Sequence, residues 1–73
     1  MATFPDRLKL LRKECGLKQR EMADICGLKL RSYQGYEYNE YYPDVPGLVA
    51  LADYFHVSLD YLMGRTDKRE VNQ

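Results

Sequence analysis

Apolar side chains recur along this chain every three or four residues, which is the spacing of one face of an α-helix. The clearest stripe runs from Phe4 through Leu8 and Leu11 to Cys15. No stretch alternates apolar with polar residues as a half-buried strand does. The pattern therefore predicts an all-α fold, a compact domain of five helices over residues of about 4–15, 19–26, 30–38, 45–55 and 59–63.

The residues between these segments support the predicted boundaries. Asp44 and Ser58 are of the type that caps the start of a helix, because their side chains accept hydrogen bonds from free backbone N–H groups. Gly16, Gly27 and Gly64 follow periodic segments, where a left-handed residue commonly ends a helix. Each helix is thus expected to be short and to end at a definite residue.

The connection between the second and third segments is unusually tight. Gly27 permits a sharp turn, and Leu28 is expected to fill the core between the two helices. Ala23 is small enough to let the third helix cross close to the second. Two short helices joined by such a glycine-containing turn form a helix-turn-helix, which is what we predict for these two segments.

The length of 73 residues predicts one domain with a small core. We expect a helix-turn-helix domain over residues 1–66 and a polar, flexible tail over residues 67–73. The longest apolar run, residues 45–52, is too short to cross a bilayer. The charges of Asp6, Arg7 and Lys9 argue against a secretory signal at the start of the sequence.

The two cysteines, Cys15 and Cys26, have neither metal-ligand spacing nor a disulfide framework. We therefore expect a cytoplasmic protein with reduced thiols and without a metal or cofactor. The single histidine, His56, has no partner ligands and is interpreted as structural. An enzyme is not expected, because the chain has no nucleophile–base signature and no phosphate-binding glycine loop.

The formal net charge is zero, but the charge is unevenly distributed along the chain. Residues 1–35 hold eight Lys or Arg against four Asp or Glu, whereas residues 36–73 hold three against seven. Such asymmetry favours a basic binding face in the first half. Charged residues of a small domain are also commonly nothing more than its solvated surface, so the charge alone does not identify a nucleic-acid partner.

Several segments follow one another in a fixed order over residues 4–66. They are GLKQREMA at 16–23, GL at 27–28, YE at 36–37, PD at 43–44, LADYF at 51–55 and VSLDYLMG at 57–64. Together they resemble the lambdoid phage Cro and repressor domains, within the xenobiotic-response-element family of bacterial regulators. The most specific part of the resemblance is the joint occurrence of Gln19, Ala23 and Gly27 with the segment 57–64.

The resemblance implies that the third helix lies in the major groove of double-stranded DNA. Arg31 would then pair with a guanine, Gln34 with an adenine, and Leu30 with a thymine methyl group. The residues expected on the exposed, base-reading face are Lys29, Leu30, Arg31, Gln34 and Gly35. The residues expected to contact phosphates, which set register without reading sequence, are Lys18, Gln19, Arg20, Tyr38 and Asn39.

The resemblance also implies a structural ion pair between Arg12 and Glu37, and the expected function is that of a homodimeric regulator, a repressor or an activator, that binds a palindromic operator. The expected dimer interface consists of Leu59, Tyr61, Leu62, Tyr41 and Tyr42. Two departures from the family pattern concern the helix starts, since Lys18 and Lys29 replace hydroxyl residues that would act as caps.

Two alternatives stay open on the sequence. An antitoxin-like module that binds a toxin and regulates its own operon would suit the acidic, tyrosine-rich second half. A controller protein of a restriction–modification system would share the same DNA-binding domain.

Overall fold

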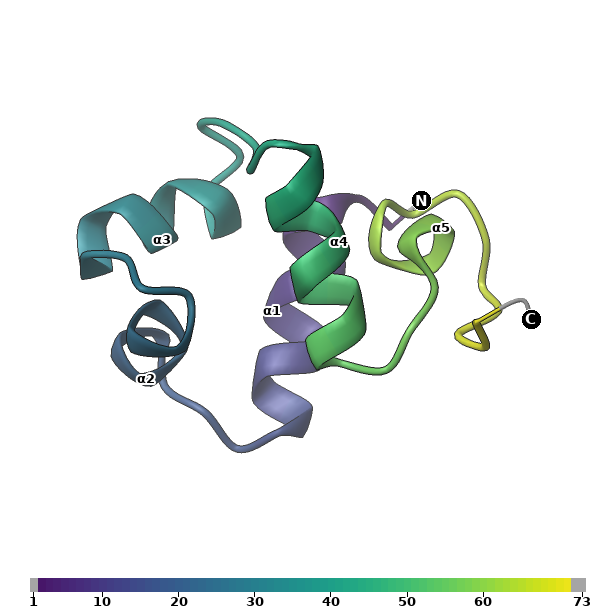
Figure 1. Ribbon diagram of the computed structural model, residues 1–73, viewed down its shortest axis with the longest axis horizontal. Helices are drawn as coiled ribbons and strands as arrows, with labels where there is room; N and C mark the ends of the chain where they lie inside the picture. The colour runs from purple at the N-terminus through teal and green to yellow at the C-terminus, as the bar shows by residue number, and fades with distance from the viewer. Residues whose placement is uncertain (1, 72–73) are drawn as a thin grey trace.

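The computed structural model describes residues 2–71, and within them the chain forms five helices and no strand (Figure 1). Met1, Asn72 and Gln73, which the expected domain and tail include, lie outside the described residues. The helices are α1 (Phe4–Glu14), α2 (Gln19–Ile25), α3 (Leu30–Glu37), α4 (Val45–Tyr54) and α5 (Leu59–Leu62). The predicted all-α fold is confirmed.

Each helix ends one residue earlier than predicted. The last residue of each predicted segment is the cap, at which the backbone leaves the helix while its N–H still bonds back into the last turn; these caps are Cys15, Cys26, Tyr38, Phe55 and Met63. Cys15 is the C-cap of α1 and is exposed, so it does not complete the apolar stripe that the sequence predicts for this helix.

The helix starts differ in how they are capped. Asp44 and Ser58 act as predicted, each accepting a hydrogen bond at 2.9 Å from a backbone N–H three residues later. Lys18 and Lys29 supply no such cap to α2 and α3. At α2, the carboxylate of Glu21 compensates by accepting a hydrogen bond at 2.9 Å from the backbone N–H of Lys18.

The core lies around α1, which packs against α3 and α5, while α2 packs on α3 and α4 packs on α5. Figure 1 shows α2 and α3 on one side of α1 and α5 toward the other. The completely buried side chains come from four helices and include Leu8, Met22, Tyr33 and Leu62. In the part of the chain that the structure describes, no helix has the length and apolar character needed to cross a membrane.

The turn between α2 and α3 has the expected geometry. Gly27 has a left-handed backbone with φ of 69°, and the next N–H, that of Leu28, donates to the carbonyl oxygen of Ala23 at 2.9 Å. Leu28 packs against the core, and the Ala23 side chain is buried. These contacts hold α2 and α3 as one unit.

The sequence predicts a flexible tail from residue 67 onward, but the first residues of this segment are bonded to the helical domain. Asp67 accepts a hydrogen bond from Arg7 at 3.0 Å, and the carbonyl oxygen of Arg69 accepts one from the backbone N–H of Ser58 at 2.8 Å. The guanidinium of Arg69 donates to both carboxylate oxygens of Glu14, at 2.8 and 2.7 Å. Residues 67–69 are therefore tied to α1 and α5.

Candidate nucleic-acid interface

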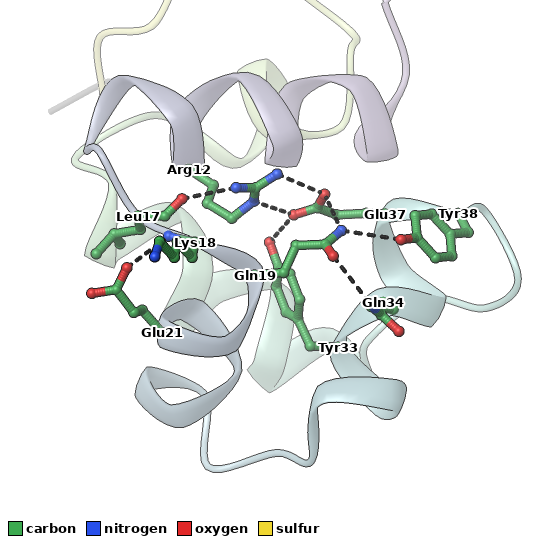
Figure 2. Close-up of polar contacts among 9 residues, drawn as sticks. All are labelled: Arg12, Leu17, Lys18, Gln19, Glu21, Tyr33, Gln34, Glu37 and Tyr38. Atoms are coloured by element: carbon green, nitrogen blue, oxygen red, sulfur yellow. Dashed lines mark hydrogen bonds and ion pairs between the residues drawn. The ribbon is translucent and has the colours of Figure 1, made fainter.

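The orientation of α3 is fixed by an ion pair beneath it, which Figure 2 shows at the centre of a polar network. The Nε of Arg12, on α1, donates to Oε2 of Glu37 at 2.6 Å, and its Nη2 donates to Oε1 at 3.2 Å. The third nitrogen, Nη1, donates to the carbonyl oxygen of Leu17 at 2.8 Å. One guanidinium thus joins α1, the α1–α2 connection and the end of α3, and it places Arg12 and Glu37 in contact.

Two further donors complete the environment of Glu37. The hydroxyl of Tyr33 donates to Oε2, and Nε2 of Gln19 donates to Oε1 at 3.1 Å. Burial alone would raise the pKa of Glu37, but the hydrogen bonds from Arg12, Tyr33 and Gln19 outweigh burial and lower that pKa below its ordinary value. The Glu37 carboxylate therefore stays charged. Its ion pair with Arg12 joins α1, the α1–α2 connection and α3.

The same network reaches two residues expected at the DNA surface. Nε2 of Gln34 donates to Oε1 of Gln19 at 3.0 Å, and Nε2 of Gln19 lies 3.4 Å from the hydroxyl of Tyr38 (Figure 2). A glutamine amide has two N–H donors and one oxygen, so the bond to Gln19 leaves Gln34 one donor and its oxygen for an adenine edge. Gln19 links the start of α2 to α3 rather than projecting freely toward a phosphate.

The cations of residues 1–35 fall into two groups. Arg7 and Arg12 are buried and bonded within the domain, so they add nothing to a binding face. The exposed cations are Lys9, Lys13, Lys18, Arg20, Lys29 and Arg31. The last four of them belong to the start and interior of α2 and the start of α3, where the expected phosphate and base contacts lie.

The first turn of α3 presents its side chains to different degrees. Lys29 and Arg31 are exposed, and Leu30 is half-buried. Arg31 is not free, because its Nη2 donates to both carboxylate oxygens of Glu40, at 2.7 and 3.0 Å. The hydrogen bond from Arg31 to Glu40 also raises the pKa of the guanidinium. Sequence reasoning missed Glu40, which lies nine positions from Arg31 and outside every motif.

Gly35 does not lie on the exposed face, contrary to expectation. It is buried, and the ring of Tyr41 covers it so closely that a Cβ at Gly35 would overlap the ring. The hydroxyl of Tyr41 donates to the carbonyl oxygen of Ser32 at 2.9 Å, which fixes the ring in this place. Gly35 therefore makes room for Tyr41, and it is not a base-reading residue.

The expected dimer residues differ in how far their side chains are exposed. Tyr61 and Leu62 are buried in the core, and the Arg7 guanidinium lies 3.9 Å above the centre of the Tyr61 ring. These two residues therefore belong to the core and not to a dimer surface, because the single turn of α5 directs both side chains inward. Leu59 is exposed.

Tyr41 and Tyr42 are half-exposed members of an aromatic cluster beside α3. The ring of Tyr42 lies 5.3 Å from that of Phe4, and the ring of Tyr41 lies 5.6 Å from that of Tyr36. The two tyrosines therefore pack the loop after α3 onto the domain, while they remain 46% and 52% exposed. Tyr38 and Asn39 are exposed, and Asn39 has a φ of 61° where the chain leaves α3.

Comparison with known proteins gives consistent matches over most of the chain. Residues 8–62 match the family described as helix-turn-helix. The chain is 41% identical over 64 residues to the HTH-type transcriptional regulator YobD of Bacillus subtilis, a match covering 88% of this chain and 57% of that protein. It is 40% identical over 67 residues to the cryptic phage CTXphi transcriptional repressor RstR of Vibrio cholerae, covering 89% of this chain and 60% of that protein.

The fold has a counterpart among solved structures. A transcriptional regulator from Listeria innocua superimposes with a TM-score of 0.81 at 37% sequence identity, over 97% of this chain and 64% of that one. The chain therefore spans less than two thirds of the length of these relatives.

Proposed function

Because the chain belongs to the helix-turn-helix family of transcriptional regulators, we propose that it represses transcription by binding a specific double-stranded DNA sequence through α3. Membership of the family confirms the resemblance found in the sequence. The observation that carries the proposal is the position of α3: the Glu37 network holds one side of the helix, while Lys29 and Arg31 are exposed at its start.

In this proposal, α3 enters the major groove and α2 lies across the backbone. Lys29, Leu30, Arg31 and Gln34 contact base edges, with Arg31 on a guanine and Gln34 on an adenine. Phosphates are contacted by Lys18, Arg20, Tyr38 and Asn39, which are all exposed. Gln19 contacts a phosphate through its backbone N–H at the positive end of α2, because its side-chain amide is bonded within the domain. We propose that this binding takes place in the cytoplasm.

We further propose that two copies bind a palindromic operator. Two recognition helices must reach successive major grooves, about 34 Å apart, and a domain this small gains useful affinity by joining a second copy. Among the dimer candidates, Leu59, Tyr41 and Tyr42 retain exposed apolar surface. The relative RstR is named a transcriptional repressor, which favours repression over activation.

The proposal is tested by selecting bound duplexes from a random DNA library and titrating the winners. An enriched inverted repeat with half-sites about one helical turn apart is the expected result. Enrichment of no sequence would overturn the proposal and favour a function through a protein partner, such as a toxin. Affinity for the selected site should fall steeply with salt, because several phosphates are neutralised per subunit.

Replacement of Arg31 tests the assignment of α3 within the same assay. Arg31→Ala should weaken binding to the selected operator by about 1–3 kcal/mol, which is roughly 5- to 150-fold. The matched control is Arg65→Ala, which removes an exposed guanidinium from the segment after α5. An equal loss in both variants would mean that charge alone, and not a base contact by Arg31, accounts for the affinity.

A further inference from the structure

We propose that Glu40 is a positioning residue that holds the Arg31 guanidinium for guanine recognition and so sets the base preference at the position Arg31 reads. The inference rests on the proposed function, since it assumes that α3 contacts bases. It adds a residue outside the helix-turn-helix to the determinants of specificity.

The backbone around Glu40 is built to return to α3. Asn39 adopts a left-handed conformation with φ of 61°, which reverses the chain after the helix. The N–H of Glu40 then donates to the carbonyl oxygen of Gly35 at 2.9 Å. On its other side, Tyr41 packs over Gly35 and donates to the carbonyl oxygen of Ser32 at 2.9 Å. The backbone at Glu40 is thus held beside α3, and its carboxylate reaches Arg31 in the first turn of that helix.

The geometry of the pair leaves Arg31 able to read a base. Both Glu40 oxygens accept from the same nitrogen, Nη2, at 2.7 and 3.0 Å, so both N–H groups of Nη1 remain to donate to a base. Guanine presents two acceptors, N7 and O6, to a guanidinium in the major groove. The Arg31 and Glu40 side chains are 67% and 42% exposed, so a base edge can reach the pair.

The effect of the pair on binding follows from order and charge. A long arginine side chain loses rotamer freedom when it binds, and a guanidinium already held by a carboxylate loses less. The pair as a whole carries no net charge, so Arg31 adds little to the attraction toward phosphates that any DNA offers. Glu40 therefore increases the ratio of the affinity for the cognate site to the affinity for other DNA, and it does not increase the affinity for DNA in general.

The test compares Glu40→Gln with the parent protein on the selected operator and on the same duplex with the guanine read by Arg31 changed to adenine. That guanine is the one whose change weakens the parent but not Arg31→Ala. Glu40→Gln should lower the ratio of the two affinities by roughly five- to tenfold, while Glu40→Asp should restore part of it. The matched control is Glu70→Gln, which removes an exposed carboxylate from the segment after α5 and should leave the ratio unchanged.

Two measurements separate positioning from a merely structural role. In an Arg31→Ala background, Glu40→Gln should have no effect on the ratio, because Glu40 acts only through Arg31. In the DNA-free protein, nuclear magnetic resonance should show distinct, slowly exchanging Arg31 Nη signals that merge in Glu40→Gln. An unchanged ratio in Glu40→Gln, or the same loss with and without Arg31, overturns the inference. If the parent itself selects no DNA, the proposed function fails and this inference fails with it; if the parent selects a site that Glu40→Gln reads equally well, only this inference fails.

Discussion

Arg7 and Arg12 lie five residues apart on α1, and their side chains are nearly equally buried, at 8% and 9% exposed. Arg12 faces the carboxylate of Glu37, which is completely buried. Arg7 faces the carboxylate of Asp67, which is fully exposed. Its other partners are the carbonyl oxygens of Tyr61 and Thr66, at 3.0 and 3.1 Å, and the Tyr61 ring.

The difference shows two ways of attaching an element to α1. At Arg12 two buried charges depend on each other, so the loss of either leaves the other without compensation. At Arg7 the guanidinium donates to two backbone carbonyls and to the carboxylate of Asp67, which is fully exposed. The first arrangement fixes the orientation of α3, and the second holds α5 and the segment after it.

The largest expected effect is at the buried pair. Glu37→Gln keeps the shape of the side chain but leaves the Arg12 charge buried without a counter-charge, and it should lower the free energy of unfolding by about 3–5 kcal/mol. Urea unfolding followed by circular dichroism measures this change. A loss below about 1 kcal/mol would place the Arg12 site in the same class as an exposed ion pair.

A smaller effect is expected from a third member of the network. Tyr33→Phe removes the hydroxyl that donates to Glu37 and should lower the free energy of unfolding by about 1.5–3 kcal/mol, the range for hydrogen bonds to charged groups. Tyr36→Phe is the matched control, because the Tyr36 ring also packs in the aromatic cluster but is only half-buried. Equal losses in the two variants would mean that the removal of any tyrosine hydroxyl, and not of the bond to Glu37, accounts for the effect.

The pH dependence of stability should also come from Glu37. Its pKa is lower in the folded protein than in the unfolded chain, so the folded state binds fewer protons in this range. The stabilisation is therefore complete above the unfolded value of about 4.3 and is lost as the pH falls through the folded pKa. Tyr33→Phe removes one cause of the lowered pKa, so denaturation curves between neutral and acid pH should show a smaller pH-dependent loss. An identical loss in parent and variant would contradict this.

The smallest effect is expected at the exposed partner of Arg7. Asp67→Asn should change the free energy of unfolding by less than about 1 kcal/mol, because Arg7 keeps its two backbone carbonyls. The same urea experiment as for Glu37→Gln provides the direct contrast. If Asp67→Asn were as damaging as Glu37→Gln, the distinction between the two arginine sites would be wrong.

The sequence predicted those features that depend on residues near one another. Helical periodicity and the caps Asp44 and Ser58 located all five helices, and Ala23, Gly27 and Leu28 located the turn. In each case the signal and the structure lie within a few residues, so local spacing is sufficient.

Features that depend on distant or irregular contacts were not predictable in the same way. Arg7 meets partners 54 to 60 positions away, and no periodicity indicates which polar residues will meet across that distance. The burial of Gly35 depends on Tyr41, which returns over α3 after the left-handed residue Asn39, and the helical spacing of α3 does not indicate this return. The resemblance predicts a dimer surface at Tyr61 and Leu62, whereas the structure buries both side chains in the core.

The most direct test of the central claim is to titrate isotope-labelled protein with its selected operator and follow the backbone amide signals by nuclear magnetic resonance. Recognition through a fixed α3 predicts that the largest shifts cluster in α3 and at the start of α2, with the signals of residues 65–71 little changed. Largest shifts in α5 and residues 65–71, with α3 unaffected, would contradict it.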